Sequence, residues 1–179
     1  RQMCIRDRRM GDDSPEADAE ILAMTVECLL ATGLTEFQVS VGQVDYYKAI
    51  FAQTGMSQEE EEELRELISQ KNYFGVEELV KNKNMDKSLA RVLSQLPQMF
   101  GSTEVLEKAK SLTDNPQALK AVARLEEIYE LLKVYGYEKY VTFDFAMLSK
   151  YHYYTGIIFQ AYTYGTGCLL YTSDAADEA

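Results

Sequence analysis

The sequence contains few of the residue types on which several kinds of site depend. Its 179 residues include no tryptophan, one histidine, three prolines and three cysteines. The cysteines Cys4, Cys28 and Cys168 match neither a metal-ligand spacing nor an even-numbered disulfide framework. We therefore expect a reducing, cytoplasmic setting and no bound metal. Cys28 lies in a helical apolar pattern and is expected to pack in the core.

Basic residues and long apolar runs are also scarce, which argues against two classes of partner. The chain has 18 basic and 29 acidic residues, a formal net charge of −11. A nucleic-acid surface needs clustered lysine and arginine to neutralise phosphates, so no nucleic-acid partner is expected. No run of about 18 apolar residues is present, so no membrane-spanning helix and no membrane partner are expected.

What is present is ordinary for one globular domain, with 46% apolar and 26% charged residues.

The two ends differ from the segments that they adjoin. "RQMCIRDR" and "CLLYTSDAADEA" resemble translated sequencing adapters. We therefore expect residues 1–8 and 168–179 to be non-native tails on a piece of a longer protein, with no part in its fold.

The first natural segment predicts a helix with marked ends. Ser14 can serve as its N-cap, Pro15 suits its first position, and Gly33 suits the residue after its end. The apolar residues that recur at helical spacing, and are expected to face the core, are Ile21, Met24, Cys28 and Leu29.

A strand and a short helix are predicted next. The alternating apolar residues of "FQVSV" favour a strand over residues 37–41. "VDYYKAIFAQTG" favours a helix that ends at Gly55, with Tyr47 on its buried face. Tyr46 and Tyr47 are both expected to serve helix packing, and a partner-facing position of Tyr46 is left open.

Residues 57–136 carry a helical pattern throughout. Ser57 and Glu60 form a capping-box signature, and the run of five glutamates over residues 59–63 favours a solvated first turn over a metal site. Shorter helices follow, and a long one is predicted between Asn115 as its cap and Gly136 after its end. The segment is interpreted as a helical insertion.

Two strands are predicted near the C-terminal end. Residues 140–148 and 155–163 both alternate between apolar and polar positions. The loop "SKYHYY" between them is too short for a crossover helix, so an antiparallel hairpin is expected. The predicted fold class is α+β, an antiparallel sheet with flanking helices and a helical insertion.

Four motifs together carry a resemblance to a known family. "SPEADAE", "GQVDYYKAIF", "KNYFGVEELV" and "FDFAMLSKYHYYTGIIFQAYTYGTG" occur here in an order and spacing similar to those of the regulatory subunits of ATP phosphoribosyltransferase. Those proteins are non-catalytic paralogues of histidyl-tRNA synthetase. The resemblance covers residues 10–167 and implies the class II aminoacyl-tRNA synthetase fold, with residues 9–56 and 137–167 as parts of one core and 57–136 as the insertion.

The resemblance also implies a function. It predicts a non-enzymatic partner of the short-form catalytic subunit in the first step of histidine biosynthesis, within a hetero-oligomer that also self-associates. It implies no cofactor, with free histidine as an allosteric ligand.

One position separates this family from its enzymatic relatives. Histidyl-tRNA synthetases carry an "R-G-L-D-Y-Y-T-G" pattern whose arginine steadies the α-phosphate during adenylation, and that position falls on Ser149. A cation aimed at developing charge is worth several kcal/mol of barrier, and a serine hydroxyl cannot replace it. Lys150 would point to the opposite face if the strand pattern persists, and it lacks the planar fork of arginine. The residues predict a pocket that binds an amino acid without activating it.

The resemblance places Tyr153 and Tyr154 beside a bound histidine, where phenol groups can hydrogen-bond an amine or imidazole. The competing interpretation is that both cover the sheet as hairpin aromatics. Gln160 and Tyr162 share one strand face and are further candidates for the same pocket. His152 has no recognisable nucleophile around it, so no catalytic residue is assigned.

Two other functions stay open at this level. A histidyl-tRNA synthetase with an unusual loop would catalyse ATP-dependent histidine activation and tRNA charging. A synthetase-like domain that binds a different amino acid or another protein is the third possibility.

Overall fold

The computed structural model describes residues 12–83, 85–148, 155–163 and 169–172, the last four as backbone only. The helices in this part of the chain are α1 (Pro15–Ala31), α2 (Val44–Phe51), α3 (Gln58–Ser69), α4 (Tyr73–Asn82), α5 (Lys87–Gln95), α6 (Thr103–Ser111) and α7 (Pro116–Tyr135). Two single turns of 3₁₀ helix are η1 (Leu96–Gln98) and η2 (Glu138–Tyr140). The strands are β1 (Phe37–Gln43), β2 (Phe100–Gly101), β3 (Val141–Asp144), β4 (Ile157–Thr163) and β5 (Leu169–Thr172).

The strands form one mixed sheet in the order β2-β3-β1-β4-β5. β1 lies between β3 and β4, parallel to β3 and antiparallel to β4. The predicted hairpin of residues 140–148 and 155–163 is therefore wrong, as is the purely antiparallel sheet. The chain does reverse direction between these strands. The connection over residues 145–156 is long enough to pass one intervening strand, since neighbouring strands lie only about 4.8 Å apart.

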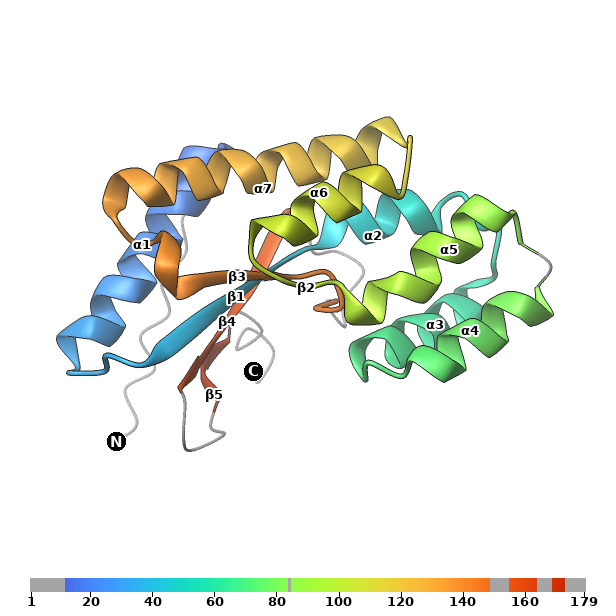
Figure 1. Ribbon diagram of the computed structural model, residues 1–179, viewed down its shortest axis with the longest axis horizontal. Coiled ribbons are helices and arrows are strands. Elements are labelled where there is room, and N and C mark those ends of the chain that lie inside the picture. Colours follow the sequence, from blue (N-terminus) through green and yellow to red (C-terminus); the bar gives the residue numbers. More distant parts are fainter. Residues whose placement is uncertain (1–11, 84, 149–154, 164–168, 173–179) are drawn as a thin grey trace.

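One face of this sheet packs against α1 and α7 (Figure 1). Strand alternation turns the apolar side chains of β1, β3 and β4 toward these helices, where they join one continuous core. The central members of this core are each 6% exposed or less: Leu22, Val26, Val39, Val41, Leu125, Ile128, Phe143, Phe159 and Ala161. The opposite face of the sheet is left for polar residues.

The ends of α1 are as predicted, but its buried face is only partly so: Ile21 and Leu29 are half-buried against the core, as expected. Ser14 caps the helix through a hydrogen bond from Ala17 N, and Gly33 follows with φ +87°. Met24 and Cys28, expected in the core, are exposed. The helix instead buries small residues that allow close approach to its neighbours, together with two larger ones, namely Ala17, Ala19, Leu22, Ala23 and Val26.

Tyr46 on α2 packs in the interior, as expected for helix packing, and the partner-facing alternative is wrong. Its side chain is fully buried, and its hydroxyl donates to Ala109 O of α6 over 3.1 Å. The ring also meets Phe145 edge to face, with 4.8 Å between the ring centres. Tyr46 therefore ties α2 to α6 and to the segment that follows β3.

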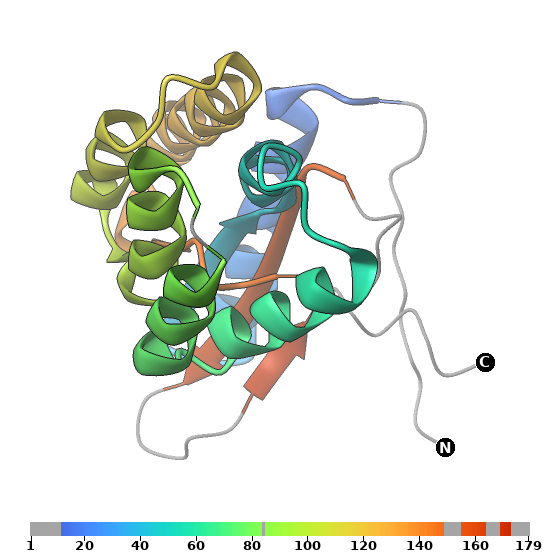
Figure 2. The same cartoon turned by 90° about the vertical axis from the view of Figure 1, so that its right-hand side faces the viewer.

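The predicted caps of residues 57–136 are confirmed. Ser57 and Glu60 exchange both capping-box hydrogen bonds, and Asn115 and Gly136 bound α7. The segment is not helical throughout, because β2 pairs with β3 at the sheet edge. α3, α4 and α5 gather at one end of the molecule, and Figure 2 shows them from that end, in front of the sheet. α7 packs along α1 and α2.

Within the residues that the structure describes, no helix combines the length and apolar character needed to cross a membrane.

Candidate functional site

The sheet face turned away from α1 and α7 carries a row of polar side chains. β1 contributes Gln38 and Ser40, β3 contributes Thr142 and Asp144, and β4 contributes Tyr162. The pairing register sets Ser40 opposite Gln160 and Gln38 opposite Tyr162. This polar face floors a pocket of about 280 Å³. We call it the sheet-face pocket; its remaining lining residues are Lys71, Phe100 and Thr163.

An ion pair closes one side of the sheet-face pocket. Lys71 Nζ lies 2.8 Å from Asp144 Oδ2, and it also lies over the Phe100 ring, 4.9 Å from the ring centre. The other carboxylate oxygen of Asp144 accepts a hydrogen bond from Ala146 N. Asp144 is 8% exposed, whereas the Lys71 side chain is half exposed. The carboxylate is therefore fixed, and the ammonium reaches it from the loop between α3 and α4.

Lys71 holds an unusual backbone conformation. Its φ is +55°, and among the described residues other than glycine no other has a positive φ. The left-handed region costs such a residue about 1 kcal/mol or more. The conformation ends α3 and begins α4 within three residues, so it brings the lysine side chain over β3.

Hydrogen bonds order the rest of the pocket floor. The hydroxyls of Ser40 and Thr142 lie 3.3 Å apart across β1 and β3. The Tyr162 hydroxyl donates to Gln160 Oε1 on the same strand face. Burial raises the pKa of Tyr162, and the negative charge of Asp144 raises it further. The tyrosine therefore stays a neutral phenol that can donate or accept a hydrogen bond at physiological pH.

The chain that leaves β3 crosses the same face of the sheet at Gly42. A Cβ built on Gly42 would lie 2.9 Å from both Cβ and O of Met147 and 3.1 Å from Asp144 O. Only glycine leaves room for this crossing. The crossing segment limits the sheet-face pocket at the end of β3 and directs the chain toward β4.

The predicted site residues fall into two groups. Gln160 and Tyr162 lie on one strand face, as expected, and Tyr162 lines the sheet-face pocket. Tyr153, Tyr154 and Ser149 lie outside the described residues, as do Lys150 and His152.

Sequence reasoning missed Lys71, Phe100 and Asp144 as pocket residues. The polar position of Asp144 in an alternating strand was a usable signal. No signal in the sequence marks Lys71 or Phe100 as a pocket residue, because their positions depend on how segments distant in the sequence pack against β3.

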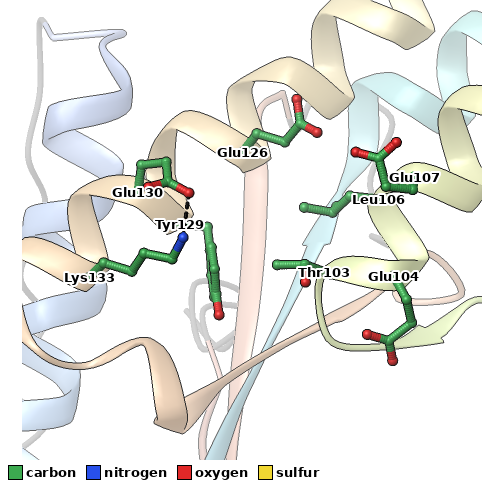
Figure 3. A pocket seen from close by; sticks show the side chains of 8 residues that line it. All are labelled: Thr103, Glu104, Leu106, Glu107, Glu126, Tyr129, Glu130 and Lys133. Carbon is green, nitrogen blue, oxygen red and sulfur yellow. Dashed lines mark hydrogen bonds and ion pairs between the residues drawn. The ribbon is translucent and has the colours of Figure 1, made fainter.

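A larger groove of about 520 Å³ lies between α6 and α7 (Figure 3). Half of its lining residues are glutamates, and its lysine, Lys133, pairs with Glu130 over 2.6 Å. Lys110, which does not line the groove, pairs with Glu126 of its lining. The Lys133 ammonium also lies over the Tyr129 ring. No cluster of metal-ligating side chains is found in the described part of the chain. The groove has the character of a solvated helix surface, and the sheet-face pocket is the better candidate site.

The sheet-face pocket combines groups that fit a zwitterion. Asp144 can accept from an ammonium or imidazole group, and Lys71 can pair with a carboxylate. In the described part of the pocket the hydroxyl of Ser40 faces another hydroxyl and not a general base, so it is not an activated nucleophile. The arrangement is suited to binding.

Sequence comparison identifies relatives along nearly the whole chain. A sequence model of the family described as Histidyl-tRNA synthetase matches residues 8–172. The ATP phosphoribosyltransferase regulatory subunit of Acetivibrio thermocellus is 40% identical over 158 residues, which cover 88% of this chain and 38% of that protein. The chain thus spans about two fifths of the length of the curated relatives that it matches.

Two solved structures share the fold. A protein from Bacillus halodurans, described as an ATP phosphoribosyltransferase regulatory subunit/histidyl-tRNA synthetase, is 32% identical with a TM-score of 0.81, over 89% of this chain and 42% of that one. A chain of the ATP phosphoribosyl transferase complex from Thermotoga maritima is 19% identical with a TM-score of 0.67, over 88% of this chain and 54% of that one. The family model matches most of the chain, and the solved relatives share its class II synthetase fold. The chain therefore belongs to the histidyl-tRNA synthetase family.

Proposed function

We propose that this chain is part of a non-catalytic regulatory subunit of ATP phosphoribosyltransferase. The subunit associates in the cytoplasm with the short catalytic subunit, in a hetero-oligomer that also contains further copies of itself. It is needed for the transferase activity and transmits feedback inhibition by histidine in the first step of histidine biosynthesis. It uses no cofactor of its own.

The names of the relatives support this proposal. Curated relatives at 34–40% identity are named ATP phosphoribosyltransferase regulatory subunit. The Thermotoga maritima neighbour belongs to a complex of that transferase. The resemblance described above also implies that Ser149 takes the place of the adenylating arginine of histidyl-tRNA synthetases. The synthetase alternative is not favoured, because a neutral hydroxyl cannot stabilise the charge that develops on a phosphate.

The observation that carries the ligand assignment is the Lys71–Asp144 pair over the polar sheet face. Free histidine offers a carboxylate for Lys71 and an ammonium or imidazole group for Asp144. Tyr162 and Gln160 supply hydrogen-bonding groups beside them. The pocket volume of about 280 Å³ suits a single amino acid. Tyr153 and Tyr154 are proposed to complete the ligand contacts.

Feedback then requires a difference in affinity. Histidine must bind the inhibited arrangement of the complex more tightly than the active one, by about 1–3 kcal/mol of coupling free energy. Because Lys71 joins the α3–α4 segment to β3, a ligand that engages Lys71 would change how that segment rests on the sheet. This contact is the proposed link between the pocket and the rest of the subunit.

Two assays on the full-length protein test the proposal. Calorimetric titration is expected to show histidine binding that weakens about tenfold in Asp144→Asn, because an ammonium group loses its charged partner. Histidine-dependent exchange of pyrophosphate into ATP is expected to be absent. Exchange above background would establish the synthetase and refute the regulatory assignment. Histidine binding that is unchanged in Asp144→Asn would refute the sheet-face pocket as its site.

A further inference from the structure

A second cleft lies on the opposite side of the sheet, and its lining comes from the end of β1, from α2 and from α7. Figure 1 shows where these three elements meet. The cleft encloses about 460 Å³. Its polar lining comes from the end of β1 and from facing positions of α2 and α7, and includes Gln43, Asp45, Lys48, Lys120 and Arg124. We call it the Gln43 cleft. Alternate residues of a strand face opposite sides of the sheet, so Gln43 lies on the same side as Val39 and Val41, and Ser40 lies on the other side. The sheet therefore separates the Gln43 cleft from the sheet-face pocket.

The side-chain amide of Gln43 is a buried donor without an acceptor. Gln43 is 2% exposed, and its Oε1 accepts a hydrogen bond from Asp45 N over 3.2 Å. A backbone N–H can only donate, so this contact fixes which end of the amide is the oxygen. Nε2 is therefore the free end, and it has no hydrogen-bond partner among the described residues. Buried polar groups are nearly always paired, so an orphan donor that lines a cleft indicates a missing acceptor.

The acidic residues of the Gln43 cleft already have partners. Asp45 Oδ2 accepts from Gly156 N over 2.9 Å. Asp13 binds the Arg124 guanidinium at 2.8 Å, and Asp18, which does not line the cleft, binds the same guanidinium at 2.7 Å. These contacts leave the carboxylates of the cleft engaged by groups of the protein itself.

Positive charge gathers in the same cleft. Lys48 from α2 and Lys120 from α7 line it beside Arg124. The three basic residues outnumber the two aspartates that line the cleft, Asp13 and Asp45, in a chain whose formal net charge is −11. Relative to the rest of the surface, the Gln43 cleft is therefore a favourable place for an anion.

We propose that the Gln43 cleft binds an oxyanion, the phosphate or carboxylate group of a small molecule. An anionic oxygen accepts the hydrogen bond from Gln43 Nε2 at the floor of the cleft. The ammonium group of Lys120 pairs with its charge at the rim, and Lys48 adds positive charge nearby. The site is separate from the proposed histidine pocket and does not depend on the function assigned to it.

Nuclear magnetic resonance of the ¹⁵N-labelled protein tests this site directly. The side-chain amide signals of Gln43 are followed while inorganic phosphate or, separately, acetate is added at constant ionic strength. A saturating shift of these signals is expected with the preferred anion, and comparison of the two anions assigns the site to phosphate or carboxylate chemistry. A shift that grows linearly without saturation with both anions, as for an adventitious ion only, would overturn the proposal.

Matched variants identify the groups that bind. Gln43→Glu keeps an oxygen that can accept from Asp45 N, but it removes the donor and adds negative charge, so anion affinity should fall at least about tenfold. Lys120→Gln should weaken binding about two- to fivefold, as for a rim charge. The controls Gln98→Glu and Lys108→Gln make the same changes at exposed positions away from the cleft. Equal anion affinity in Lys120→Gln and Lys108→Gln would contradict the site, even if Gln43→Glu failed to fold.

Discussion

Lys71 and Asp144 are 73 positions apart in the sequence and form a 2.8 Å ion pair over the polar face of the sheet. The pair joins the loop between α3 and α4 to the end of β3. It combines a half-exposed lysine in a left-handed conformation with a carboxylate that is nearly buried. The proposed histidine pocket is built around this contact.

Replacing Lys71 with glycine removes two opposing contributions to stability, the cost of its left-handed backbone and the gain from its ion pair with Asp144. Glycine relieves about 1 kcal/mol of left-handed strain, and a half-exposed ion pair contributes about 0–1 kcal/mol, so the unfolding free energy should change by less than about 1 kcal/mol. Urea denaturation measures this. Lys83→Gly is the matched control, since Lys83 also makes an ion pair but has φ −89°. Lys83→Gly should lose more stability than Lys71→Gly, and the reverse order would contradict this account of Lys71.

Adding a methyl group at Gly42 should destabilise the crossing after β3. In Gly42→Ala the new Cβ would lie 2.9 Å from Met147 O, and the backbone of the crossing would have to shift. Overpacking of this kind costs about 1–3 kcal/mol, measurable as a lower urea midpoint. Gly33→Asn is the control. A Cβ built on Gly33 would have no atom of another segment within 4 Å, and asparagine tolerates the left-handed region. Equal stability of Gly42→Ala and the unmodified protein would show that the crossing is not tightly packed.

The two buried tyrosines of α2 should respond differently to loss of their hydroxyls. Tyr46→Phe removes the hydrogen bond to Ala109 O and should cost about 1 kcal/mol or more of unfolding free energy. The Tyr47 hydroxyl is buried with no hydrogen-bond partner in the described structure, so Tyr47→Phe should leave stability unchanged or raise it slightly. Thermal denaturation of the two variants provides the comparison. A larger loss in Tyr47→Phe than in Tyr46→Phe would contradict these contacts.

Asp18 should give the protein a distinctive dependence on pH. Burial raises its pKa above the ordinary value of 3.8, and the contacts with Arg124 only partly oppose this. The folded state therefore holds this proton more tightly than the unfolded state does, so the contribution of Asp18 to stability is full below pH 3.8 and is lost as pH rises through the folded pKa. Asp18→Asn should remove that decline.

Unfolding free energies measured between pH 3 and 6 would reveal the effect of Asp18 as a difference between the protein and Asp18→Asn. The difference should change in favour of the variant as pH rises. A change in the opposite direction would mean that the ion pair with Arg124 outweighs burial. Glu16→Gln, on an exposed position of the same first turn of α1, controls for a general effect of charge at the helix start.

Local signals in the sequence predicted helix ends well. Ser14, Ser57, Asn115 and Gly136 act within one helical turn, so their roles depend only on neighbouring residues. The buried face of α1 was partly misassigned because both sides of that helix carry apolar residues. The helix buries the side rich in alanine and leaves Cys28 exposed.

Contacts between distant segments could not be predicted in the same way. Alternation correctly placed Gln160 and Tyr162 on one face of β4, but it contains no information about which strand pairs with which. β1 therefore went unrecognised as the strand between β3 and β4. The same limit applies to Lys71, whose place over Asp144 depends on the packing of the α3–α4 loop against the sheet.

The most direct test of the proposed function is the transferase rate of the short catalytic subunit, measured with the full-length protein against histidine concentration. The rate should depend on the added protein and fall as histidine rises. Asp144→Asn should need about tenfold more histidine for the same inhibition, because the ligand loses a charged partner, whereas Glu127→Gln, at an exposed position of α7, should not. A rate that is the same with and without the protein would contradict the account.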